Sequence, residues 1–300
     1  MTRARIIFVP GLNPKPPPDI YRQQLLRVMS AGLASTRPRS ADWLAKNADA
    51  FVLVAWTYLF YGAHRDVTLD LPGIEQLLVQ TEPSERDRRE LRSWQRRALR
   101  WSHLVGDAWP LLGRRLAPAN TRRLMHEANR YLKNRDGVGA AVRGVLRETL
   151  EAAWRDGDSV LLIGHSLGSV IAYDTLWDLT HVQRSRGVIS TFVTLGSPLA
   201  TRFVQRSLQG VRERGAARYP HNVRRWVNCS ARGDMTALKP RLKPFFHEML
   251  DLDLCDAIED FVDFDNYFRG GAGLNAHEAY GYLAQHVLAE VIGDWLERAL

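Results

Sequence analysis

Residues 160–173 read Val-Leu-Leu-Ile-Gly-His-Ser-Leu-Gly-Ser-Val-Ile-Ala-Tyr, and they are the most informative part of the sequence. Apolar residues run into the sequence Gly-His-Ser-Leu-Gly at 164–168, and a helical pattern runs out of it. A Gly-x-Ser-x-Gly sequence alone is weak evidence, since about one chain in ten of this length contains it by chance. The preceding strand and the following helix make it informative, because they predict a sharp strand-to-helix turn with a serine at its tip.

The predicted turn explains why each residue type stands where it does. The serine takes a strained backbone angle, and Gly164 and Gly168 lack side chains so that strand and helix can approach each other. The Ser166 hydroxyl then projects from the carboxyl edge of the sheet, and the Leu167 N–H at the helix start faces a developing oxyanion. The alternative is a coincidental glycine-rich turn without chemistry.

Outward from this turn, short apolar runs alternate with longer helical stretches, which is the pattern of a parallel sheet covered by helices. The fold class is therefore α/β, and we expect residues 1–300 to form one domain with a mostly parallel central sheet. Strands are predicted at 5–9, 51–58, 159–163, 188–195 and 223–227. Helices are predicted at 20–34, 138–155, 168–181, 200–214 and 278–300.

Residues 62–137 are too long for a simple connection, which usually takes about 2–6 residues, so we predict a helical insertion. An apolar stripe with spacings of three and four residues crosses it, with arginines on another side. The stripe is Leu91, Trp94, Ala98, Trp101 and Val105, and the arginines are Arg88, Arg92, Arg96 and Arg100. Three interpretations are open: an amphipathic helix packed on the core, a lid over an apolar pocket that touches lipid, or a nucleic-acid-binding face.

The composition is that of a globular chain. Its 300 residues are 45% hydrophobic and 25% charged, which excludes disordered, collagen-like and disulfide-scaffold classes. The longest apolar run, 51–63, is too short to span a membrane, and the N-terminal run is too short for a secretory signal. We therefore expect a cytoplasmic protein. Cys229 and Cys255 fit neither a disulfide framework nor a metal motif, which predicts reduced, buried thiols and no metal.

The formal net charge of +8 is unevenly distributed. Residues 84–101 hold seven arginines against three acidic residues, whereas residues 244–268 hold eight acidic residues and neither Lys nor Arg. A polarised chain of this kind does not predict a nucleic-acid partner. The acidic stretch is interpreted as a solvated helix face, since it lacks the glycine and glutamate of a calcium loop.

Three segments together resemble the α/β-hydrolase superfamily, in particular its lipase- and esterase-like serine hydrolases. They are residues 164–168, residues 8–12 (Phe-Val-Pro-Gly-Leu) and residues 194–199 (Thr-Leu-Gly-Ser-Pro-Leu). The resemblance covers most of the chain outside the insertion. It implies a nucleophile, Ser166, an oxyanion hole, and then an acid and a histidine later in the chain, in that order.

Asp234 is the candidate acid, because it ends a polar turn after the strand at 223–227, where the family keeps its carboxylate. Asp251, Asp253 and Asp256 are competitors within the acidic stretch. The family usually has another strand between acid and histidine, and none is apparent before residue 277.

Three histidines follow Asp234, namely His247, His277 and His286. His277 is the candidate base, since it ends a glycine-rich loop directly before the last helix, where the family places its histidine. His286 is expected mid-helix, as a packing or surface residue.

The second oxyanion donor is expected in the turn after the first strand, through the N–H of Leu12. Pro10 stands where the family often has histidine, and the alternative is a plain turn. His165 is interpreted as a packing residue and Ser197 as a helix-cap or turn residue.

These residues predict a serine hydrolase that cleaves a carboxylic ester through an acyl-enzyme, without metal or cofactor. If the insertion is a lid, we expect a lipophilic substrate, either a small-molecule ester or a lipid. The arginines would then make a peripheral contact with the membrane. A non-catalytic hydrolase-like binding module and an acyltransferase using the same three residues are the alternatives.

Overall fold

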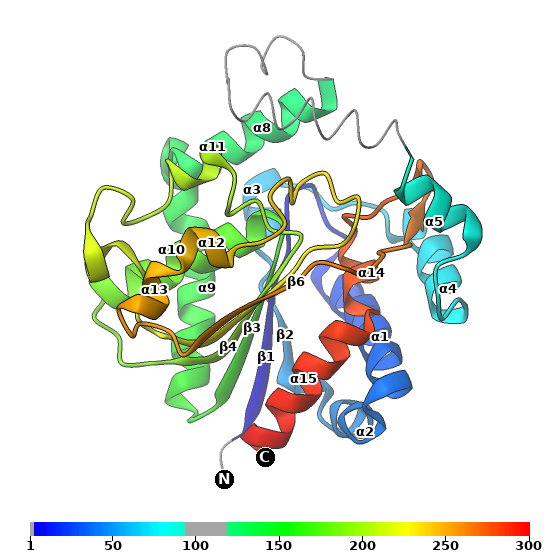
Figure 1. The fold of residues 1–300 in the computed structure, drawn as a ribbon, viewed down its shortest axis with the longest axis horizontal. Helices are drawn as coiled ribbons and strands as arrows, with labels where there is room; N and C mark the ends of the chain where they lie inside the picture. Colours follow the sequence, from blue (N-terminus) through cyan, green and yellow to red (C-terminus); the bar gives the residue numbers. More distant parts are fainter. Residues whose placement is uncertain (1–2, 94–118) are drawn as a thin grey trace.

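A parallel sheet forms the centre of the computed structural model, which describes residues 3–93 and 119–300 (Figure 1). Within these residues six strands pair in the order β2-β1-β3-β4-β5-β6, each pair parallel. The strands are β1 (Ala4–Val9), β2 (Phe51–Leu53), β3 (Ser159–His165), β4 (Ile189–Leu195), β5 (Val223–Cys229) and β6 (Ala257–Phe261). The predicted α/β class with a parallel central sheet is confirmed.

Both faces of this sheet are buried, which explains why its central strands read as continuous apolar runs. In β3, Leu161 and Ile163 join one hydrophobic core, while Val160 and Leu162 join the other. The first core contains α1 (Pro18–Thr36), α2 (Pro38–Lys46), α4 (Leu71–Val79), α5 (Glu85–Leu91), α14 (Ala279–Leu283) and α15 (His286–Ala299). The second contains α3 (Trp56–Tyr61), α8 (Ala119–Leu132), α9 (Val138–Arg155), α10 (Leu167–His181), α11 (Arg202–Gln205), α12 (Lys243–Phe246) and α13 (Glu248–Asp251).

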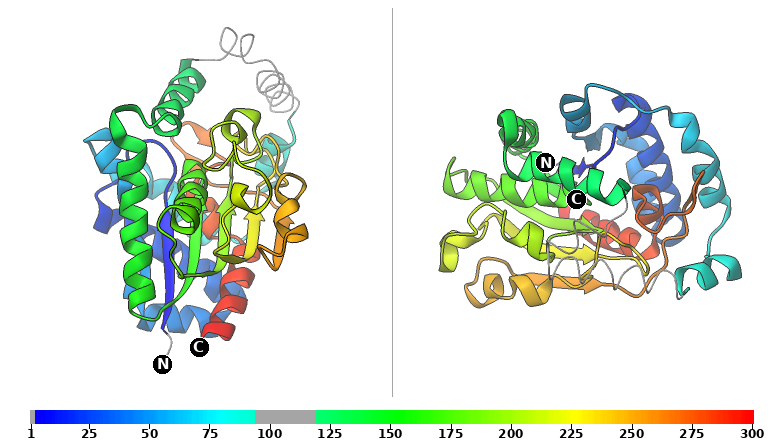
Figure 2. Two further views of the ribbon diagram at one scale, coloured as in Figure 1. Left: turned by 90° about the vertical axis from the view of Figure 1, so that its left-hand side faces the viewer. Right: turned by 90° about the horizontal axis from the view of Figure 1, so that it is seen from above.

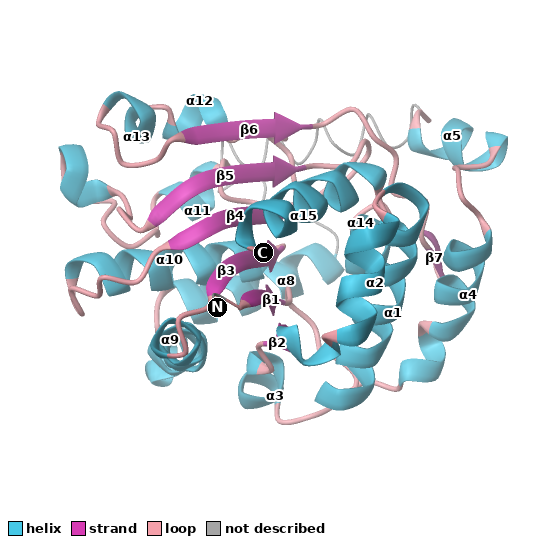
Figure 3. Cartoon of the chain, turned by 90° about the horizontal axis from the view of Figure 1, so that it is seen from below, coloured by secondary structure: helices cyan, strands magenta, loops and turns pink. Residues whose placement is uncertain are grey.

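The two helical layers lie on opposite sides of the sheet, as α9 and α15 show in the left view of Figure 2 and in Figure 3. A small hairpin, β7 (Arg269–Gly270) and β8 (Gly273–Leu274), follows β6. The chain leaves β1 toward β2 on one side and returns to β3 on the other. Ligands of open α/β sheets bind at such a switch point, beyond the carboxyl ends of the strands.

The structure corrects three predicted elements. The strand predicted at 51–58 stops at Leu53, and Trp56–Tyr61 is α3, because a short apolar run does not by itself separate strand from buried helix. The helix predicted at 200–214 is only α11, followed by turns in which Gly210 has a positive φ. The last predicted helix is broken into α14 and α15.

The acidic stretch is also corrected, because part of it forms β6 rather than a solvated helix face. The Asp260 carboxylate accepts hydrogen bonds from the N–H groups of Leu242 and Lys243, at 2.7 and 3.0 Å, and from the Asn228 amide at 2.7 Å. An acidic residue in this strand therefore fixes the loop that follows β5.

Cys229 and Cys255 are free, buried thiols, as expected. No helix in the described parts of the chain is long and apolar enough to cross a membrane. The described parts of 62–137 include α4, α5 and α8. Of the predicted stripe and its arginines, Leu91, Arg88 and Arg92 are described, whereas the other named residues lie outside the described ranges.

One buried carboxylate ties α8 to the centre of the molecule. The Tyr131 hydroxyl of α8 donates to Asp174 Oδ2 of α10 at 2.9 Å, and the Gln209 N–H donates to Oδ1 at 2.9 Å. Burial raises the pKa of Asp174 to about 7. Between about pH 4 and pH 7 the buried carboxyl therefore holds a proton that the unfolded chain, in which the pKa has its ordinary value of 3.8, has released.

We predict that Asp174→Asn weakens the pH dependence of stability. Folding of the wild type takes up this proton between about pH 4 and pH 7, so its stability falls as pH rises across that interval. The Asp174→Asn variant has no such proton to lose. Thermal melting at about pH 5 and about pH 8 measures the difference, and equal pH effects in both proteins would contradict the assignment.

Candidate active site

Ser166 stands at a strained turn between β3 and α10, with φ 53° and ψ −127°. A side chain at Gly164 would place its Cβ 2.6 Å from Ser169 Cα, and one at Gly168 would overlap the Val9 carbonyl oxygen. Both glycines are thus required by the approach of α10 to the sheet. Strain of this kind costs of order 1–3 kcal/mol and persists only where the surroundings enforce it.

Three side chains far apart in the sequence form a continuous hydrogen-bonded chain. Ser166 Oγ lies 2.9 Å from His277 Nε2, and His277 Nδ1 lies 2.8 Å from Asp234 Oδ2. Asp234 comes from the loop after β5, and His277 from the segment between β8 and α14. Because the Asp234 carboxylate accepts a hydrogen bond from Nδ1–H of His277, the proton of the neutral ring lies on Nδ1. Nε2 is then free to accept the proton of the Ser166 hydroxyl. This arrangement can turn the hydroxyl into a nucleophile.

Asp234 is 1% exposed, yet its environment favours the charged form of the carboxylate. Burial pushes its pKa up, but attraction to His277 and hydrogen bonds from His277, Tyr282 and the Thr236 N–H outweigh burial and hold the pKa below 3.8. The Thr236 N–H donates to Oδ1 at 2.8 Å. Asp234 is therefore ionised at neutral pH and able to stabilise a protonated His277.

Tyr282 and Gly196 belong to the site, although the sequence did not assign them to it. The Tyr282 hydroxyl donates to Asp234 Oδ2 at 2.6 Å and accepts from the Ala231 N–H at 2.9 Å. Gly196 has φ 54°, and a Cβ there would lie 2.5 Å from Asp234 Oδ2. Gly196 has a sequence signal, as a glycine directly after a predicted strand, whereas a tyrosine inside a helix has none.

His165 and Ser197 make supporting contacts. His165 Nε2 donates to the His277 carbonyl at 2.7 Å, and the centroids of the two rings lie 4.7 Å apart. Burial lowers the pKa of His165 far below 6.5, so this ring is neutral and anchors the His277 backbone. Ser197 Oγ bonds Ser169 Oγ at 2.7 Å and the Leu199 N–H at 3.2 Å, as a turn residue does.

The candidate oxyanion donors lie next to Ser166. A Cβ at Gly11 would be 2.6 Å from Ser166 Cβ, so the turn after β1 packs directly against the serine, and Leu12 is the next residue. Leu167 is the first residue of α10, where N–H groups have no acceptor within the helix. The Leu12 amide thus comes from the turn after β1, which packs against Ser166, and the Leu167 amide comes from the start of α10.

The competing residues lie elsewhere. His247 is exposed and contacts Asp251 at 3.8 Å, and His286 begins α15, where it contacts Glu290 at 3.7 Å. His286 is thus at a helix start and not mid-helix as expected. In the described ranges no group of three or more His, Cys, Asp or Glu side chains is arranged to hold a metal ion.

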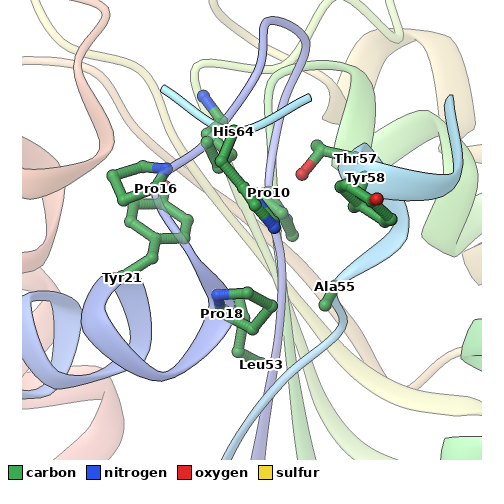
Figure 4. Close-up of a pocket in the computed structure, with 10 residues that line it drawn as sticks. Pro10, Pro16, Pro18, Tyr21, Leu53, Ala55, Thr57, Tyr58 and His64 are labelled. Atoms are coloured by element: carbon green, nitrogen blue, oxygen red, sulfur yellow. The ribbon is translucent and has the colours of Figure 1, made fainter. Parts of the chain in front are cut away.

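A small pocket borders the turn after β1 (Figure 4). Pro10, Pro16 and Pro18 contribute to its wall, facing Thr57 and Tyr58 of α3. The Pro10 carbonyl also accepts a hydrogen bond of 2.9 Å from the Trp56 indole. The prolines, whose φ is fixed by their rings, stiffen the segment that passes Ser166.

Comparisons of the chain with protein-family models, with curated proteins and with solved structures gave no match.

We predict that Tyr282→Phe destabilises the protein more than Tyr280→Phe. Removal of the Tyr282 hydroxyl leaves the buried Ala231 N–H and Asp234 each short of a partner, at a cost of about 1–3 kcal/mol. Tyr280 is the matched control, because its buried hydroxyl has no hydrogen-bond partner among the described residues. Chemical denaturation measures both, and equal losses would refute the role given to Tyr282.

Proposed function

We propose that this protein is a serine hydrolase that cleaves a carboxylic ester through an acyl-enzyme. The observation that carries the proposal is the chain of contacts from Ser166 Oγ through His277 to Asp234, at 2.9 and 2.8 Å. A nucleophile, a base and an orienting carboxylate in hydrogen-bond contact are what acyl transfer requires. A binding module has no need of all three.

In the first half-reaction, His277 Nε2 takes the proton of Ser166 as Oγ attacks the ester carbonyl carbon. The tetrahedral intermediate collapses when the carbon–oxygen bond to the alcohol breaks, and the imidazolium gives its proton to the departing oxygen. An acyl-Ser166 ester remains. Asp234 keeps the imidazole oriented and stabilises its positive charge, without taking the proton itself.

In the second half-reaction, His277 takes a proton from water as the water oxygen attacks the acyl carbon. The proton then passes to Ser166 Oγ, and the carboxylic acid leaves. The N–H groups of Leu12 and Leu167 are the proposed oxyanion donors in both halves. Each such donor is worth on the order of 10²–10³ in rate.

The order of the elements supports assignment to the α/β-hydrolase superfamily. The nucleophile follows β3, the acid follows β5, and the histidine follows β6 and its hairpin. Serine, acid and histidine thus come in the chain order of that superfamily. β6 supplies a strand between acid and histidine, which the sequence pattern alone did not reveal.

The proposed substrate is a lipophilic ester, a small molecule or a lipid. This preference depends on residues 62–137 acting as a lid, and residues 94–118 of that segment lie outside the described ranges. The arginine-rich segment at 86–100 is the proposed contact with an anionic lipid surface.

We predict that a fluorophosphonate labels Ser166 stoichiometrically. Labelling should vanish in Ser166→Ala and slow by at least about 100-fold in His277→Ala, since the base is then missing. His286→Ala is the matched control and should label like the wild type. Peptide mass mapping identifies the labelled residue.

Label on another residue, or equal labelling rates with and without the His277 imidazole, would refute the proposed centre. If Ser166 is labelled but added alcohol outcompetes water as acceptor of the acyl group, the activity is acyl transfer and not hydrolysis.

A further inference from the structure

Like Ser166, Asn13 in the turn after β1 has a positive φ, of 73°. Its N–H donates to the Tyr61 hydroxyl at 3.0 Å, and that hydroxyl donates to Glu127 Oε2 at 2.7 Å. Tyr61 ends α3, and Glu127 lies on α8, so residues from three distant segments meet here. Figure 1 shows α8 beyond the carboxyl ends of the strands, on the side where this turn lies.

A fourth residue closes these contacts into a ring. Arg123, one turn before Glu127 on α8, donates to Asn13 Oδ1 at 3.3 Å and lies 3.8 Å from Glu127 Oε1. The Arg123 side chain is 61% exposed, so its ion pair contributes little. The hydrogen bonds of the Tyr61 hydroxyl are the stronger part of the ring.

The Tyr61 hydroxyl is suited to hold both neighbours at once. Burial and the hydrogen bond to Glu127 raise its pKa above the ordinary value of 10.0, so it stays protonated. Its one proton goes to the carboxylate, which leaves its oxygen lone pairs for the Asn13 N–H. Phenylalanine in place of Tyr61 would keep the ring packing and lose both hydrogen bonds.

We propose that Tyr61 is a positioning residue for the oxyanion hole, an inference that rests on the proposed function. Leu12 lies between two fixed points: Gly11, which packs against Ser166, and Asn13, whose N–H is held by Tyr61. The peptide units on both sides of Leu12 are planar, so fixing them fixes the direction of the Leu12 N–H. Tyr61 therefore aims the donor without touching the substrate.

The same contacts link α8 to the turn after β1. Besides Glu127, α8 is held by Arg130, which donates to the Phe60 carbonyl at 2.8 Å and lies 4.6 Å over the Phe60 ring. Tyr131 adds the buried bond to Asp174. With α8 fixed in this way, Glu127 holds Tyr61, and Glu127→Gln should misplace the turn less severely than loss of the hydroxyl.

The test measures kcat and KM for 4-nitrophenyl butyrate, a soluble ester, in wild type, Tyr61→Phe and Glu127→Gln. A displaced oxyanion donor weakens transition-state binding, so Tyr61→Phe should lower kcat by roughly 10–100-fold and leave KM within about threefold. Glu127→Gln should lower kcat by a smaller factor. Fluorophosphonate should still label Ser166 of Tyr61→Phe to completion, more slowly than in the wild type.

Tyr219→Phe is the matched control, because the Tyr219 hydroxyl also donates to a glutamate, Glu248, at 2.7 Å. It removes a bond of the same kind from another part of the molecule and should leave kcat unchanged. A kcat of Tyr61→Phe equal to that of the control, or a change in KM alone, overturns the inference. Should Tyr61→Phe not fold, an unchanged kcat in Glu127→Gln overturns it.

Failure of the proposed function gives a different result. A wild-type protein that neither labels at Ser166 nor hydrolyses the ester refutes the hydrolase and the role of Tyr61 together. An active wild type with an unaffected Tyr61→Phe refutes the role of Tyr61 alone.

Discussion

The site depends on the strained backbone of Ser166, which the sheet holds in place. The Ser166 N–H donates to the Leu195 carbonyl of β4 at 2.9 Å, and its carbonyl accepts from the Ser169 N–H at 3.0 Å and from Ser169 Oγ at 2.6 Å. Side chains at Gly164 or Gly168 would separate the helix from the strands. The turn therefore keeps its shape only while β1, β3, β4 and α10 remain closely packed, and the geometry of the candidate site depends on the whole core.

Parallel strand order brings the other functional groups to the same edge. Gly11 follows β1, Ser166 follows β3, Gly196 follows β4 and Asp234 follows β5. Since all these strands run in one direction, their carboxyl ends meet, and residues far apart in the sequence come together at one edge. His277 reaches the edge by another route, through β6 and the hairpin. There the His165 ring holds its backbone carbonyl.

Local patterns in the sequence predicted the central strands, whose residues are buried on both faces, and they missed β6, where burial is partial. β3 is a continuous apolar run followed by glycine, so both the strand and the turn could be recognised. β6 lies at the edge of the sheet, and Glu259 and Asp260 make it read as polar. The Glu259 carboxylate pairs with Arg225 of the neighbouring strand at 2.7 Å, a contact that no local pattern reveals.

The supporting tyrosines show a further limit of sequence reasoning. The hydroxyls of Tyr61 and Tyr282 each bond to partners on other segments, and their neighbours Tyr58 and Tyr280 are tyrosines too. Residue type and spacing therefore do not distinguish the bonded hydroxyl from the others. What distinguishes Tyr282 is a buried carboxylate that must be compensated. With donors from Tyr282, His277 and Thr236, Asp234 can stay charged where bulk water does not reach it. The neighbouring His165 ring is neutral, so these donors alone compensate the carboxylate.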